Sequence, residues 1–105
     1  MTGGLSTHVL DLAKGRPAEG LKVTLKRGDV VLFEGATNAD GRCPDLMPKG
    51  ALEAGAYALV FQVEGYLANA FFPVVTIDFV VSDPSSHHHV PLLLSPFGYS
   101  TYRGS

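Results

Sequence analysis

Residues 56–64 have the sequence AYALVFQVE, in which large apolar side chains recur at every second position. The recurring set consists of Tyr57, Leu59, Phe61 and Val63. Successive side chains of an extended strand point to opposite faces of a sheet, so this set shares one face. The pattern predicts a β-strand that buries one face and leaves smaller or polar residues on the other.

The same alternation continues outward in both directions along the chain. Further strands are predicted at residues 5–12, 21–26, 30–34, 74–81, 88–94 and 98–103. Turns with Gly, Pro, Asn or Asp separate them at residues 14–17, 27–29 and 37–41. Seven to eight short strands in 105 residues predict an all-β fold, a β-sandwich.

Three segments depart from this alternation. We expect one short helix within residues 65–70 (GYLANA) and a loop with a short edge strand at residues 43–50. Pro91 has no backbone N–H to donate, which favours a sheet edge or a bulge for residues 88–94 rather than a central position.

A chain of 105 residues is expected to form a single domain, residues 1–105. Its 46% hydrophobic content is more than a lone domain of this size easily buries, which predicts an oligomer. The net charge of −2 offers no basic surface for nucleic acid or a membrane. Cys43 is the one cysteine, so no intramolecular disulfide is possible. With neither a signal peptide nor a membrane span in the pattern, we expect a cytoplasmic protein.

Histidine is the first candidate for chemistry, and the chain has His8, His87, His88 and His89. In a strand, His87 and His89 share one face while His88 points to the other. The His-x-His pair could bind zinc, although no Cys, Asp or Glu stands at a suitable spacing to complete a site. Surface or interface histidines without a chemical role are the remaining alternative.

Residues 87–105 (HHHVPLLLSPFGYSTYRGS) end the chain with aromatic side chains that disordered tails seldom carry. This favours a packed terminus, although the final Gly-Ser taken alone could be a cloning remnant. Arg42 follows a turn and, taken alone, could be a solvated arginine. Cys43 could be a nucleophile, but no activating partner is evident.

Together, three segments resemble the transthyretin-related family, and specifically its 5-hydroxyisourate hydrolases of purine catabolism. The segments are residues 5–11 (LSTHVLD), 37–42 (TNADGR) and 89–105 (HVPLLLSPFGYSTYRGS), and the resemblance spans essentially the whole chain. The YRGS ending is similar to the hydrolase branch rather than to the thyroid-hormone carriers. The resemblance implies a transthyretin-like β-sandwich that forms a homotetramer, a dimer of dimers, with its sites between dimers. No metal and no organic cofactor are implied.

Carried onto this chain, the resemblance implies two overlapping sets of site residues. The catalytic set is His8, Arg42, His89 and Ser105, and the substrate-binding set is His8, Arg42, Tyr102 and Arg103. One departure is visible, because the family often has an aromatic residue where this chain has His88. We expect His88 to point away from His89, with little consequence for the chemistry.

The implied reaction is hydrolysis of a ring amide of 5-hydroxyisourate, which yields 2-oxo-4-hydroxy-4-carboxy-5-ureidoimidazoline in urate degradation. Histidine suits the proton steps because its ordinary pKa, about 6.5, lies close to working pH. The planar fork of Arg42 suits the carbonyl oxygens of a flat ring. Which histidine is the base stays open.

Two alternatives from other classes remain. A transthyretin-like carrier of a small ligand needs a mainly apolar channel. A structural β-sandwich module predicts that His8, Arg42 and His89 are scattered.

Overall fold

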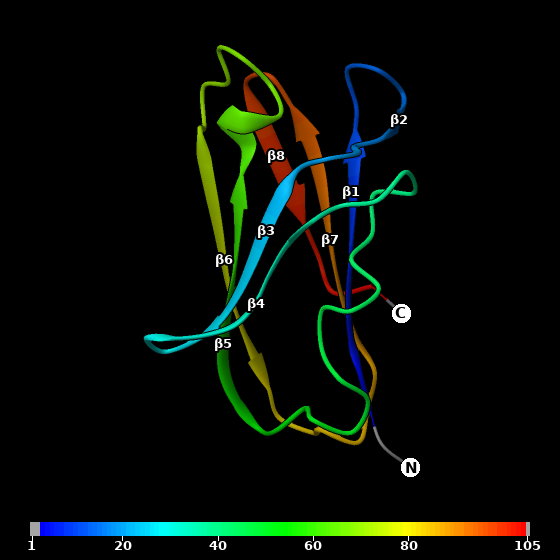
Figure 1. The fold of residues 1–105 in the computed structure, drawn as a ribbon, viewed down its shortest axis with the longest axis vertical. Helices are drawn as coiled ribbons and strands as arrows, with labels where there is room; N and C mark the ends of the chain where they lie inside the picture. The colour runs from blue at the N-terminus through cyan, green and yellow to red at the C-terminus, as the bar shows by residue number, and fades with distance from the viewer. Residues whose placement is uncertain (1–2, 105) are drawn as a thin grey trace.

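The computed structural model describes residues 3–104, which form two four-stranded β-sheets packed face to face (Figure 1). The strands are β1 (Leu5–Asp11), β2 (Arg16–Pro17), β3 (Lys22–Arg27), β4 (Val30–Ala36), β5 (Gly55–Gln62), β6 (Val74–Val81), β7 (His88–Ser95) and β8 (Gly98–Thr101), and one 3-10 turn, η1 (Val63–Gly65), follows β5. The predicted all-β sandwich is confirmed.

The strand order brings the two ends of the chain together. One sheet has the order β2-β1-β7-β8 and the other β4-β3-β5-β6. β1 and β7 pair in parallel, with Leu5 opposite His88 and Asp11 opposite Leu94. In Figure 1 these are the blue and orange strands that run side by side. Histidines far apart in sequence therefore lie on neighbouring strands.

Buried side chains from both sheets form one core, which includes the face of β5 that alternation predicts to be buried. Val9 and Leu92 come from one sheet, and Leu25, Leu59 and Phe61 from the other; all are fully buried. Each such side chain stabilises the fold by about 1.5–3 kcal/mol relative to its exposed state. The intervening residues of β1 and β7 are left on the outer face of their sheet, where all except the buried Pro91 are partly buried.

The prediction that Pro91 places its strand at an edge or a bulge is wrong. β7 lies between β1 and β8, and both pairings run without a register shift. The backbone N–H of His88 donates to the carbonyl oxygen of Gly4, on the β1 side. Successive backbone nitrogens of a strand point to alternate sides, so the nitrogen of Pro91, three residues later, points away from β1. The β8 ladder ends where Thr101 faces Leu92, and the missing N–H falls just beyond it. The Thr101 hydroxyl donates to the Pro91 carbonyl oxygen at 2.8 Å.

Three smaller expectations are also corrected. The helical turn lies at Val63–Gly65 rather than within residues 65–70, and Asn69 there has a left-handed φ of 65°, which breaks a helix. Residues 43–50 contain turns and no strand. The predicted turn at residues 14–17 instead includes the short strand β2, which pairs with the end of β1.

Within residues 3–104, no helix has the length and apolar character that crossing a bilayer would require.

Candidate active site

Arg42 is held beside β1 by the turn that precedes it. The side-chain oxygen of Asn38 accepts the backbone N–H groups of Asp40 (2.9 Å) and Arg42 (3.0 Å). Gly41 adopts a left-handed φ of 75°, which glycine tolerates best, and its carbonyl accepts the Val9 N–H at 2.8 Å. Arg42 is thereby paired with His8 by a backbone bridge, and its side chain is exposed.

His8 and His89 share the outer face of the β2-β1-β7-β8 sheet. In the parallel register Ser6 lies opposite His89, and His8 lies opposite Pro91. Residues that face each other across a ladder point to the same side of the sheet, and both histidines are partly buried there. Arg42, His8 and His89 therefore meet on one surface, although they come from three separate segments.

The His89 ring is held from two sides. Its Nδ1 lies 2.7 Å from the Ser6 hydroxyl. A Cβ on Gly104 would overlap with Cδ2 of the ring, so the terminal segment lies directly against the opposite ring edge. Burial, and then the positive charge of Arg42, lower the pKa of His89 below its ordinary value of 6.5. At neutral pH this favours an uncharged imidazole that can accept a proton.

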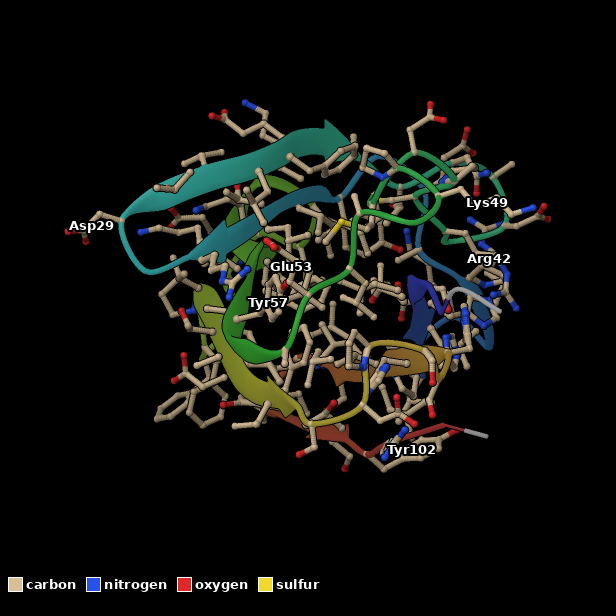
Figure 2. All side chains as sticks on the ribbon, turned by 90° about the horizontal axis from the view of Figure 1, so that it is seen from below. Asp29, Arg42, Lys49, Glu53, Tyr57 and Tyr102 are labelled. Atoms are coloured by element: carbon tan, nitrogen blue, oxygen red, sulfur yellow. The ribbon has the colours of Figure 1, made fainter. Side chains whose placement is uncertain are left out.

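The terminal segment continues the line of β8 past Pro91. Gly104 donates its N–H to the His89 carbonyl at 2.8 Å, in the same register that pairs Thr101 with Leu92. Tyr102 consequently falls opposite Pro91, on the face that carries His8. Figure 2 shows Arg42 beside β1 and Tyr102 beside the red terminal segment, both far from Asp29.

The two other predicted residues of the terminus are Arg103 and Ser105. Arg103 lines a cavity of about 280 Å³ between β6 and the end of β8, which His89 and Tyr102 also line, and its predicted role in substrate binding stays a prediction. Ser105 lies outside the described residues, so its predicted catalytic role stays a prediction.

The histidines that flank the site behave differently from each other. His88 is buried and points inward, away from His89 as expected, with Nδ1 2.9 Å from the Ser86 carbonyl oxygen. His87 is exposed, and its Nε2 lies 2.9 Å from the Ser6 hydroxyl. Sequence reasoning did not single out Ser6. Its position two residues before His8, on the same strand face, was the available signal.

Chemically, this surface combines a cation with imidazoles that can move protons. Within residues 3–104, the side chains of His8 and Arg42 make no hydrogen bond or ion pair with another side chain, which leaves their donors available to a ligand. Across that same range, no cluster of three or more His, Cys, Asp or Glu could hold a metal ion. The arrangement suits a flat, polar molecule whose developing negative charge faces the guanidinium.

The chain is similar to known proteins in both sequence and structure. Residues 5–104 match the model of the HIUase/Transthyretin family. The chain is similar to a 5-hydroxyisourate hydrolase of Deinococcus radiodurans, with 48% identity over 114 residues covering 97% of this chain and 96% of the relative. The structure of a Klebsiella pneumoniae 5-hydroxyisourate hydrolase is similar at 40% identity and a TM-score of 0.83, covering 96% of this chain and 92% of that one. A transthyretin from Sparus aurata is similar at 32% identity and a TM-score of 0.82, covering 95% of each chain.

Proposed function

This chain belongs to the HIUase/Transthyretin family, and we propose that it hydrolyses 5-hydroxyisourate with His8, Arg42 and His89 as its catalytic side chains. Curated relatives that are 42% to 48% identical are 5-hydroxyisourate hydrolases, from Mus musculus to Deinococcus radiodurans. The protein is a hydrolase of that reaction, which belongs to urate degradation.

Ring opening requires an activated water, stabilisation of an oxyanion and a proton for the departing nitrogen. His8 and His89 orient the water and remove its proton, because a neutral imidazole is a base matched to neutral pH. Arg42 keeps its charge, and its fork binds the carbonyl oxygens and stabilises the negative charge that develops on the amide oxygen. Tyr102, on the same face, contacts the ring.

The observation that carries this proposal is the convergence of Arg42, His8 and His89 on one sheet face. It also favours an enzyme over a transthyretin-like carrier, because a carrier channel is lined mainly by apolar groups. A structural module would leave these three residues scattered, whereas a backbone bridge and one strand register hold them together.

We also infer a homotetramer, built as a dimer of dimers in the cytoplasm, that acts on 5-hydroxyisourate at sites between subunits. Its support is the apolar surface left outside the core: Phe71, Val80 and Phe97 are each at least 68% exposed, on or near the edge strands β6 and β8. Light scattering at micromolar concentration should report four subunits. A fully active monomer would contradict this assembly.

The direct test of the function is spectrophotometric. Urate oxidase generates 5-hydroxyisourate from urate, and the decay of its absorbance is followed with and without the protein. We expect decay many times faster than the spontaneous reaction and proportional to protein concentration. Decay at the spontaneous rate would contradict the proposal.

A further inference from the structure

Ser6 makes a contact that the proposed mechanism has not used. Its hydroxyl oxygen lies 2.7 Å from Nδ1 of His89 and 2.9 Å from Nε2 of His87. One hydroxyl therefore joins the partly buried histidine of the site to an exposed histidine at its rim. The parallel register produces this contact, because it sets Ser6 opposite His89, with His87 two residues earlier on the same side.

Proton counting makes the states of the two rings depend on each other. A hydroxyl has one proton to donate and two lone pairs that accept, and each neutral imidazole has one N–H and one bare nitrogen. If Ser6 donates to His87, it accepts the Nδ1 proton of His89. Nε2 of His89 then carries no proton.

The neighbouring glycines keep both rings in this arrangement. Gly104 lies against the Cδ2 edge of His89, opposite the edge that Ser6 contacts. A Cβ on Gly4 would lie 3.3 Å from Nδ1 of His87, so that ring packs closely over the start of β1. With its Nδ1 and Cδ2 edges both occupied, His89 has Nε2 as the nitrogen left for the reaction.

We propose that Ser6 and His87 are positioning residues that fix His89 with Nε2 unprotonated and carry its positive charge between the two proton steps. The inference rests on the proposed hydrolysis. When Nε2 of His89 takes a proton from the attacking water, its Nδ1 proton moves to Ser6, and the Ser6 proton moves to Nε2 of His87. The charge thus leaves the partly buried ring for the exposed one. As Nε2 of His89 then protonates the departing nitrogen, both relay protons return and the starting state is restored.

The charges around His89 favour this transfer. His8 faces it from β1, Arg42 from the segment after β4, and His87 from the residue before β7. Asp78 of β6 and Arg103 of the terminal segment line a cavity with it. Burial and the positive charges of Arg42, His8 and His87 lower the pKa of His89. An imidazolium is therefore disfavoured at His89 relative to the solvated rim, where water stabilises the charge on His87.

The test uses the unaltered protein and four variants, one of them a control. Ser6→Ala removes the bridging hydroxyl, and Ser6→Thr keeps it. His87→Gln keeps an oxygen that accepts from Ser6 but cannot hold a proton. Ser95→Ala is the matched control, because Ser95 lies on the same face of β7 as His89 and its hydroxyl donates to the Gly98 carbonyl oxygen at 3.0 Å, away from the site.

We expect Ser6→Ala and His87→Gln to lower kcat about 10- to 100-fold with KM changed less than about threefold. Ser6→Thr should restore most of the rate, and Ser95→Ala should match the wild type. A protonated His87 opposes a second positive charge on His89. His87→Gln removes that repulsion, so the pKa of His89 should rise and the acid limb of kcat/KM should move to higher pH. A wild-type kcat in Ser6→Ala or in His87→Gln would overturn the proposal.

Nitrogen-15 spectra of the His89 ring supply a readout that does not depend on turnover. In the wild type, Nδ1 should carry the proton and Nε2 should show the shift of a bare nitrogen; Ser6→Ala should lose this preference. A protonated Nε2 in the neutral wild-type ring would overturn the inference. Absence of any hydrolysis by the wild type would contradict the proposed function instead, and the same spectra would still report whether Ser6 sets the tautomer.

Discussion

The polar side chains at the two ends of strand β1 differ in whether they have hydrogen-bond partners. At the C-terminal end Asp11 is buried, and both of its carboxylate oxygens are occupied. One accepts the N–H groups of Ala13 and Lys14, each at 3.0 Å, and the other accepts the Tyr66 hydroxyl at 2.6 Å. Burial alone would raise the pKa of Asp11, but these hydrogen bonds outweigh it and lower that pKa below 3.8.

At the N-terminal half of the same strand, His8 faces outward beside Arg42, and neither side chain has a side-chain partner within residues 3–104. The polar groups around Asp11 form hydrogen bonds that hold a turn and the η1 segment to the sheet. The polar groups around His8 have donors and acceptors that form no such bonds. Polar groups with complete partners stabilise a fold; groups held in place without partners are available to a substrate. Substitutions at the two ends should therefore affect different measurements.

Arg42→Ala is expected to show the largest effect, on rate alone. Removing the guanidinium removes a permanent positive charge that faces the developing oxyanion, and kcat/KM should fall at least about 100-fold. Arg42 is exposed, so the free energy of unfolding should change by no more than about 0.5 kcal/mol. Absorbance decay of 5-hydroxyisourate and urea unfolding measure the two quantities.

Arg42→Lys is the matched control, because it keeps the charge and loses the planar fork. An intermediate rate would assign part of the effect to the fork and part to the charge. A large fall in the free energy of unfolding of Arg42→Ala, alongside its fall in kcat/KM, would contradict the proposed contrast between the two ends of β1.

Part of the fold could be predicted from the sequence, and the limits of that prediction are physical. Alternation identified the buried face of β5, because a period of two is a local property. It could not identify β7 as the parallel partner of β1, since pairing between residues this far apart leaves no local mark. Without that register, the meeting of Ser6 with His89 was not predictable.

The errors have the same origin. Pro91 favours an edge by its local chemistry, yet it occupies an inner strand because the β8 ladder stops one residue short of it. The roles of His8, Arg42 and His89 came from the resemblance of whole segments to a family, and the hydrogen-bonded turn from Asn38 to Arg42 explains why one of those segments has its sequence.

Gly104→Ala is expected to have a smaller effect than Arg42→Ala and again mainly on rate. The added methyl group would overlap with Cδ2 of His89, so either the ring or the terminal segment must move. A displacement of about 1 Å can cost on the order of 100-fold in rate, and partial relaxation should leave a loss of about 10-fold or more. Gly98→Ala serves as a control, because a Cβ there meets only the Ser95 hydroxyl oxygen, at 3.8 Å. Equal activity in the two variants would show that the terminal segment does not position His89.

Tyr66→Phe should have the smallest effect on rate and should act on stability instead. The change removes one hydrogen bond from the buried Asp11 carboxylate, and bonds to charged groups contribute about 1.5–3 kcal/mol. Burial and the bond to Asp11 raise the pKa of Tyr66 to about 12, so its hydroxyl remains a donor throughout the working range of pH.

Because folding lowers the pKa of Asp11, the stabilisation by its carboxylate is present above pH 3.8 and is lost as the carboxylate becomes protonated below it. The loss of stability in Tyr66→Phe, measured by urea unfolding, should therefore be largest near neutral pH and shrink below pH 3.8, while kcat/KM stays within about twofold of the wild type. Tyr99→Phe, which removes a hydroxyl from an exposed ring, is the control and should leave both quantities unchanged. A rate loss in Tyr66→Phe comparable to that of Arg42→Ala would mean that the Asp11 end of β1 belongs to the catalytic machinery after all.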